Sequence, residues 1–90
     1  MNARSISRVL QDLADAEIAN HSQRFFKTGK GEYGEGDRFL GIRVPVLRQH
    51  IRQFRGVAPK EVLKLLASKF HEERLFALLL LVDRFRRGTD

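Results

Sequence analysis

The 90-residue sequence contains no cysteine and no tryptophan, and it has only two prolines. Without cysteine the chain has neither a disulfide nor a thiolate, which excludes a disulfide-stapled miniprotein and thiolate metal or nucleophile chemistry. The longest apolar run, residues 75–82, is far shorter than the ~20 residues of a membrane helix, and the N-terminal residues lack the apolar core of a signal peptide. We therefore expect one small domain over residues 1–90, located in the cytoplasm and without a membrane partner.

Acidic side chains are scarce in the second part of the chain. Residues 1–37 carry five basic and six acidic side chains, whereas residues 38–90 carry 12 basic and five acidic ones. The window from Arg38 to Lys60 holds six cations and no acid. Such a local excess favours a polyanionic partner. The alternative interpretation is a solvated basic face.

Apolar residues recur at helical spacing along most of the chain, which predicts an all-α fold of about five helices. The first 27 residues form either one bent helix or two short ones, the second capped by Asp15. Further helices are expected from Pro45 to Gly56, from Pro59 to about Ser68, and from about His71 to Gly88. Antiparallel helices joined by short turns are the unit of a solenoid.

The last of these helices is apolar around most of its circumference, because Phe76, Leu80 and Leu81 widen its main stripe. A helix of this kind needs cover on more than one side. Two occupants satisfy that need: a second copy of the chain, or further helices of a longer array of which residues 1–90 are the N-terminal part.

Residues 28–44 form a glycine-rich segment in which Gly29, Gly31 and Gly34 spell G-x-G-x-x-G. A dinucleotide site needs a strand before such glycines and a helix directly after them. Here a helical pattern precedes the glycines, and the next helix is expected to begin only at about Pro45. In addition, Lys30 is not followed by the Ser or Thr of a P-loop. The segment is therefore predicted to be a polar loop, with glycines for sharp turns, and not a nucleotide site.

The basic window contains a helical arginine pattern. Arg48, Arg52 and Arg55 recur at i, i+4 and i+7, one residue after the apolar positions 47, 51 and 54, which predicts a ridge along one helix beside its packed face. Arginine forks match phosphate oxygens in geometry and charge. We predict contacts to the phosphates of a nucleic acid at Arg43, Arg48, Arg52, Arg55, Lys30 and Lys60.

No residue type or spacing indicates catalysis. The three histidines, His21, His50 and His71, lie far apart and lack metal-ligand spacing, and Glu72 with Glu73 is typical of a helix start. We therefore predict no catalytic residue, no metal site and no cofactor in this chain.

Two stretches resemble the DNA alkylation repair family of the AlkD type. They are RFFKTGKGEYGEGDRFLGIRVPVLR, residues 24–48, and FHEERLFALLLLVDRFRRG, residues 70–88, so that the resemblance covers roughly residues 22–88. It implies a curved stack of HEAT-like helix pairs whose basic concave face holds duplex DNA. It also implies DNA glycosylase chemistry, the hydrolysis of N-glycosidic bonds of alkylated purines without base flipping and without a cofactor.

The resemblance further implies where the site residues lie. Phe25, Arg43 and Val44 match positions lining the family's DNA-facing cleft, although relatives carry polar residues at both positions before the proline. The family's catalytic Trp-Asp pair, with its further Arg and Trp, belongs to later helices, and this sequence has no Trp. The expectation is an N-terminal segment of a DNA repair protein that contacts alkylated double-stranded DNA without its own catalytic residues. The alternative is a non-catalytic HEAT-like protein-interaction or oligomerisation module.

Overall fold

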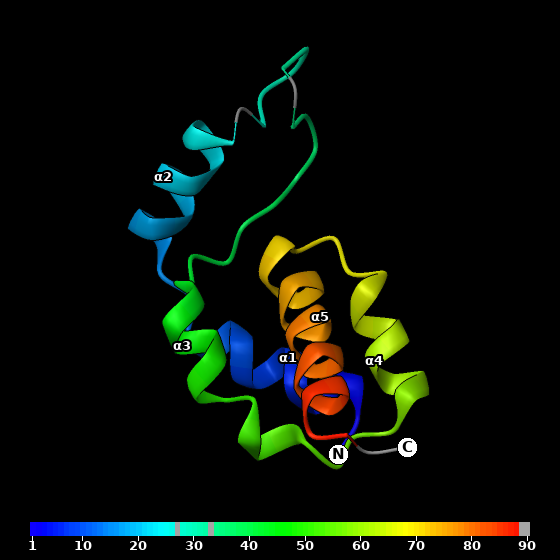
Figure 1. Ribbon diagram of the computed structural model, residues 1–90. Coiled ribbons are helices and arrows are strands. Elements are labelled where there is room, and N and C mark those ends of the chain that lie inside the picture. The colour runs from blue at the N-terminus through cyan, green and yellow to red at the C-terminus, as the bar shows by residue number, and fades with distance from the viewer. Residues whose placement is uncertain (27, 33, 89–90) are drawn as a thin grey trace.

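The computed structural model describes residues 1–26, 28–32 and 34–88. Within these ranges the chain is all-α, as predicted (Figure 1). An isolated bridge pairs Arg38 with Phe70. The elements are α1 (Ala3–Asp12), α2 (Ala16–Phe25), α3 (Val44–Gln49), the 3-10 turn η1 (Arg52–Phe54), α4 (Pro59–Leu66) and α5 (His71–Arg86).

Side-chain caps settle the number of helices near the N-terminus. Asn2 and Ser5 form a reciprocal capping box at the start of α1. Asp15 accepts hydrogen bonds from the backbone N–H groups of Glu17 and Ile18 at 2.9 and 3.1 Å, and thereby starts α2. Of the two alternatives, two short helices are therefore correct.

The core lies where α1, α4 and α5 pack together. Figure 1 shows α4 and α5 running antiparallel, and they make the most extensive contact between helices in the described chain. The Phe54 ring of η1 meets the Phe76 ring of α5 edge to face, with centroids 6.0 Å apart. The largest fully buried side chains are Ile6, Leu10, Leu47, Val57, Val62 and Phe76.

The predicted helix from Pro45 to Gly56 was wrong in its extent. It begins at Val44 and its α-helical part ends at Gln49, after which hydrogen bonds of the i to i+3 type lead through η1. Ile51 and Phe54 are both buried, and a 3-10 turn places residues three apart on the same side. The 3-10 turn keeps both side chains in the core, but it breaks the continuous arginine ridge that the sequence predicted.

The helix α2 and the glycine-rich segment extend away from the body formed by α1, α4 and α5 (Figure 1). No residue of α2 is buried. Gly31 and Gly36 adopt positive φ angles of 78° and 87°, in keeping with the predicted turns. Among the described residues no strand precedes these glycines, and the next helix begins only at Val44. None of the described helices has the length and apolar character needed to cross a bilayer.

Residues 40–42 connect α2 to the body. The Glu72 carboxylate, which is 3% exposed, accepts hydrogen bonds from the N–H groups of Leu40, Gly41 and Ile42 at 2.8, 2.9 and 3.2 Å. On the other side, the Asp15 N–H donates to the Leu40 carbonyl at 3.0 Å. Glu72 thus holds a distant loop, a role that its position at a helix start did not reveal.

Gly41 is the residue of this connection with the least room. Its φ is +88°, and a Cβ there would lie 2.0 Å from the Asp15 carbonyl oxygen and 2.7 Å from the Ala19 nitrogen. Gly36 has nearly the same φ, +87°, but a Cβ there meets no atom within 4 Å. A comparison of alanine substitutions at these two glycines therefore separates the effect of backbone strain from that of steric overlap.

We predict that Gly41→Ala lowers the free energy of unfolding by at least about 2 kcal/mol, because left-handed strain is joined by a clash with backbone. Gly36→Ala is the matched control and loses no more than about 1–2 kcal/mol, from strain alone. Urea unfolding followed by circular dichroism measures both. Equal midpoints for the two variants would show that Gly41 is not packed as described.

Candidate nucleic-acid interface

The six cations predicted to contact phosphates occupy different parts of the structure. Arg48, Arg52 and Arg55 come together at one groove, whereas Arg43 lines a second groove. Lys30 lies in the glycine-rich segment and Lys60 in the first turn of α4, both exposed and outside these two grooves. The predicted set is therefore not one continuous surface.

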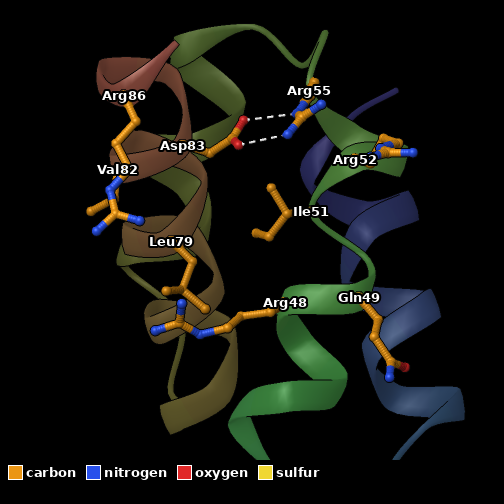
Figure 2. Close-up of a pocket in the computed structure, with 9 residues that line it drawn as sticks. All are labelled: Arg48, Gln49, Ile51, Arg52, Arg55, Leu79, Val82, Asp83 and Arg86. Atoms are coloured by element: carbon orange, nitrogen blue, oxygen red, sulfur yellow. Dashed lines mark hydrogen bonds and ion pairs between the residues drawn. The ribbon is translucent and has the colours of Figure 1, made fainter.

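The first groove, here called the α3–α5 groove, has a volume of about 420 Å³ and lies between α3 with η1 on one side and α5 on the other (Figure 2). Four arginines and one carboxylate contribute to it, above a floor that includes Ile51, Leu79 and Val82. Its charged residues are Arg48, Arg52, Arg55, Asp83 and Arg86.

Arg55 is bound to an acid on the neighbouring helix. Its Nε and Nη2 donate to the two carboxylate oxygens of Asp83 at 3.0 and 2.9 Å, and Arg87 Nε donates to the same carboxylate at 3.1 Å. The hydrogen bonds from Arg55 lower the pKa of Asp83, and Asp83 in turn raises the pKa of the Arg55 guanidinium. Asp83 is thus ion-paired with two arginines, and Arg55 is the cation of the predicted set that it neutralises.

Three guanidinium groups of the groove have no acid partner among the described residues: Arg48, Arg52 and Arg86. Figure 2 shows the Arg48 side chain extending from α3 toward α5 and that of Arg86 lying beside Val82, whereas Arg52 points away from α5. The predicted single ridge was wrong, since the tips diverge. Sequence reasoning missed Arg86, because its proximity to Arg48 arises only when α5 packs beside α3.

The second groove, of about 480 Å³, lies between α2, the start of α3 and the start of α5. Arg43 and Val44, two of the three cleft positions implied by the resemblance, line it. The third, Phe25, is 70% exposed and packs edge-on against Phe26, with ring centroids 5.1 Å apart. Phe26 itself lines the groove. The structure therefore gathers these positions at one end of the molecule.

An aromatic stack forms one wall of this second groove. The Phe39 ring lies 4.5 Å from the His71 ring and 5.2 Å from that of Phe26, measured between centroids. His71 Nδ1 lies 3.2 Å from Asp37 Oδ2, and Arg74 donates to the other carboxylate oxygen. Burial raises the pKa of Asp37, but the hydrogen bonds from Arg74 and His71 outweigh it and the net shift is downward.

The three acids that are buried in the described part of the chain, Glu61, Glu72 and Glu73, are occupied by structural hydrogen bonds. Glu61 accepts from the Ala3 N–H at 2.8 Å and from Lys64, and Glu73 accepts from the hydroxyls of Ser7 and Ser68. The Ala3 N–H and Lys64 lower the pKa of Glu61. Across residues 1–26, 28–32 and 34–88, no cluster of three or more histidines and acids has metal-binding geometry.

Comparison with known proteins identifies the family. The profile of the DNA alkylation repair enzyme family matches residues 6–90. Searches of curated proteins and of solved structures found no significant match. Since the matched region includes both grooves and nearly the whole sequence, the chain belongs to the DNA alkylation repair enzyme family.

Proposed function

We propose that this chain is the N-terminal, DNA-contacting segment of a DNA repair protein that acts on alkylated double-stranded DNA. One observation supports the proposal beyond family membership: Arg48, Arg52 and Arg86 line one groove and have no acid partner in the described part of the chain. Unpaired guanidinium groups bind phosphate oxygens through paired N–H donors and release counterions from DNA.

The individual cations contribute unequally in this proposal. Arg48 and Arg52 supply full charges, whereas Arg55 shares its charge with Asp83 and keeps only its remaining N–H donors for a ligand. Arg43 acts at the second groove, beside the cleft positions Phe25 and Val44. Lys30 and Lys60 add point charges farther along the molecule. All these contacts position DNA without reading its bases.

Excision chemistry lies outside this chain in the proposal. Hydrolysis of an N-glycosidic bond develops positive charge on the sugar, which an available carboxylate stabilises. The buried acids Glu61, Glu72 and Glu73 are instead engaged by backbone, hydroxyl and ammonium donors. This supports a segment of a HEAT-like array that holds DNA while catalytic residues belong to other helices.

We predict that the double variant Arg48→Gln, Arg52→Gln weakens binding to duplex DNA and flattens its salt dependence. If each arginine contacts one phosphate, the slope of log K against log salt falls in magnitude by about 1.8. Fluorescence anisotropy with a duplex oligonucleotide at several salt concentrations measures both quantities.

The matched control removes two other exposed arginines, Arg4 and Arg8 of α1, which lie outside both grooves. It carries the same change in net charge. Equal slopes for the two double variants would mean that net charge alone, and not the α3–α5 groove, attracts DNA.

We predict that the 90-residue chain alone releases no 7-methylguanine from alkylated duplex DNA, since its buried carboxylates are structurally engaged. Chromatography of bases released over time, against a heat-killed control, measures this. Release above that control would place excision chemistry within residues 1–90.

A second function has its own supporting observation. Four apolar side chains of α5 are exposed: Leu78, Leu81, Val82 and Phe85, the last by 86%. Exposed apolar side chains gathered on one helix mark interaction surfaces. The alternative is therefore a non-catalytic HEAT-like module that binds another protein or a second copy through α5.

Under this alternative we predict a dimer whose mass in solution does not change with salt, because apolar burial is insensitive to screening. Sedimentation equilibrium at low and high salt measures it, and Phe85→Ser returns the chain to a monomer. A monomer at all salt concentrations excludes self-association.

A further inference from the structure

We propose that α2 and the segment after it form an arm that opens away from α5, and that Asp37 and Phe39 are the latch that keeps this arm closed over the second groove. The arm comprises the described residues 16–26, 28–32 and 34–39. The inference goes beyond the proposed function, because it concerns a movement of the chain alone and needs no DNA.

The arm has few contacts with the body apart from the latch. No residue of α2 is buried, and among the described elements no helix packs extensively against it. Figure 1 shows α2 and the glycine-rich segment extending away from α1, α4 and α5. Regions with few buried apolar contacts open locally at a lower free energy than the whole protein. The arm is therefore the part of the described structure that we expect to open first.

Contacts within the arm join its parts to one another. The Gly36 N–H donates to the Thr28 carbonyl at 3.3 Å, which closes the glycine-rich loop. The N–H and the hydroxyl of Thr28 both donate to the Gln23 carbonyl of α2 at 3.1 Å. The Phe26 ring at the end of α2 stacks on the Phe39 ring. Loop and helix are thus joined at several points, so the arm moves as one unit.

The latch is made on the first residues of α5. No side chain caps this helix start, and the His71 N–H donates instead to the Arg38 carbonyl at 2.7 Å. The Asp37 carboxylate lies 3.2 Å from His71 Nδ1 and accepts from Arg74, while the Phe39 ring stacks on the His71 ring. A backbone contact, a charge contact and a ring contact from three successive residues therefore meet at the start of α5.

Residues 40–42 provide the pivot of the movement. Their N–H groups bind the Glu72 carboxylate, which is buried, and Gly41 lies directly against the Asp15 carbonyl at the start of α2. Removing the donors from a buried carboxylate is strongly unfavourable, so this contact persists. The side chain of Asp37 is 24% exposed, and water can replace its partners. Asp37 is therefore at the releasable end, next to a fixed one.

The second groove changes when the arm moves, because its lining comes from both sides. Ser22 and Phe26 belong to the arm, whereas Arg43, Val44 and Leu75 belong to the body. Opening separates these two sets of residues. The latch thus determines how wide a ligand the second groove admits.

Amide hydrogen exchange, followed by NMR in the absence of DNA, tests the latch. Asp37→Asn preserves the size of the side chain and removes its charge, and Asp12→Asn is the matched control at an exposed acid of α1. We expect the His71 N–H to exchange at least about tenfold faster in Asp37→Asn, because hydrogen bonds to a charged group are lost. The Gly41 N–H, at the pivot, changes by less than about twofold, and Asp12→Asn leaves both unchanged.

A single introduced thiol tests whether the latch controls the groove, since the chain contains no cysteine. Ser22→Cys places this thiol on the arm, at a half-buried residue that lines the groove. With Asp37→Asn we expect it to react with an aromatic disulfide at least about tenfold faster than with Asp12→Asn, because the reagent needs the open form. Arg74→Gln gives a similar gain, and combining it with Asp37→Asn adds little, since both break one contact.

Three results contradict the inference. Equal exchange in Asp37→Asn and Asp12→Asn means that Asp37 is not a latch. Faster exchange at every amide, together with a lower melting temperature, means that the arm opens only when the body unfolds. Faster exchange at His71 with unchanged thiol reactivity means that the arm does not control the groove. Since none of these measurements uses DNA, the proposed function stands or fails separately, on the duplex-binding experiment.

Discussion

One wall of the second groove depends on one carboxylate, that of Glu72, which accepts hydrogen bonds from three consecutive backbone N–H groups. These hydrogen bonds fix residues 40–42 against the start of α5, and α3 begins only two residues later. Leaving a buried carboxylate or three buried N–H groups without partners is strongly unfavourable, so the contact is made by both sides or by neither. The same segment touches α2 through Gly41 and the Asp15 N–H. Glu72 therefore determines where Arg43 and Val44 stand relative to the aromatic stack.

Charge pairing determines the character of the α3–α5 groove. A count of arginines in the sequence treats all of them as available to a ligand. In the structure, Arg55 and Arg87 both donate hydrogen bonds to the Asp83 carboxylate, so their charges are partly neutralised. The pairing also links η1 to α5 at the point where the α-helical part of α3 has already ended. One acid thus links the two walls of the groove and reduces the number of arginines that have no acid partner.

The sequence was sufficient to predict those structural features that are stabilised by local contacts. The cap at Asp15, the start of α4 at Pro59, the start of α5 at His71 and the turns at the glycines all follow from neighbouring residues. The sequence was insufficient to predict contacts between residues that lie far apart along the chain. The pairing of Arg55 with Asp83 spans 28 residues, and that of Glu72 with Leu40 spans 32. The end of α3 at Gln49 was also not predicted, and Phe54 of the following turn packs on Phe76, a residue far away in the sequence.

The exposed side of α5 shows how the two candidate functions can coexist on one helix. Phe85 and Leu79 lie about 120° apart around the helix axis, and Val82 falls between them. The side with Leu78, Leu81 and Phe85 is apolar and exposed, whereas the side with Leu79 and Arg86 faces the groove. A helix packed on the first side therefore leaves the second open to DNA, and would place its own side chains next to Val82. The proposed DNA contact and the alternative interaction surface would thus use different sides of α5, and Val82 is the residue that both sides share.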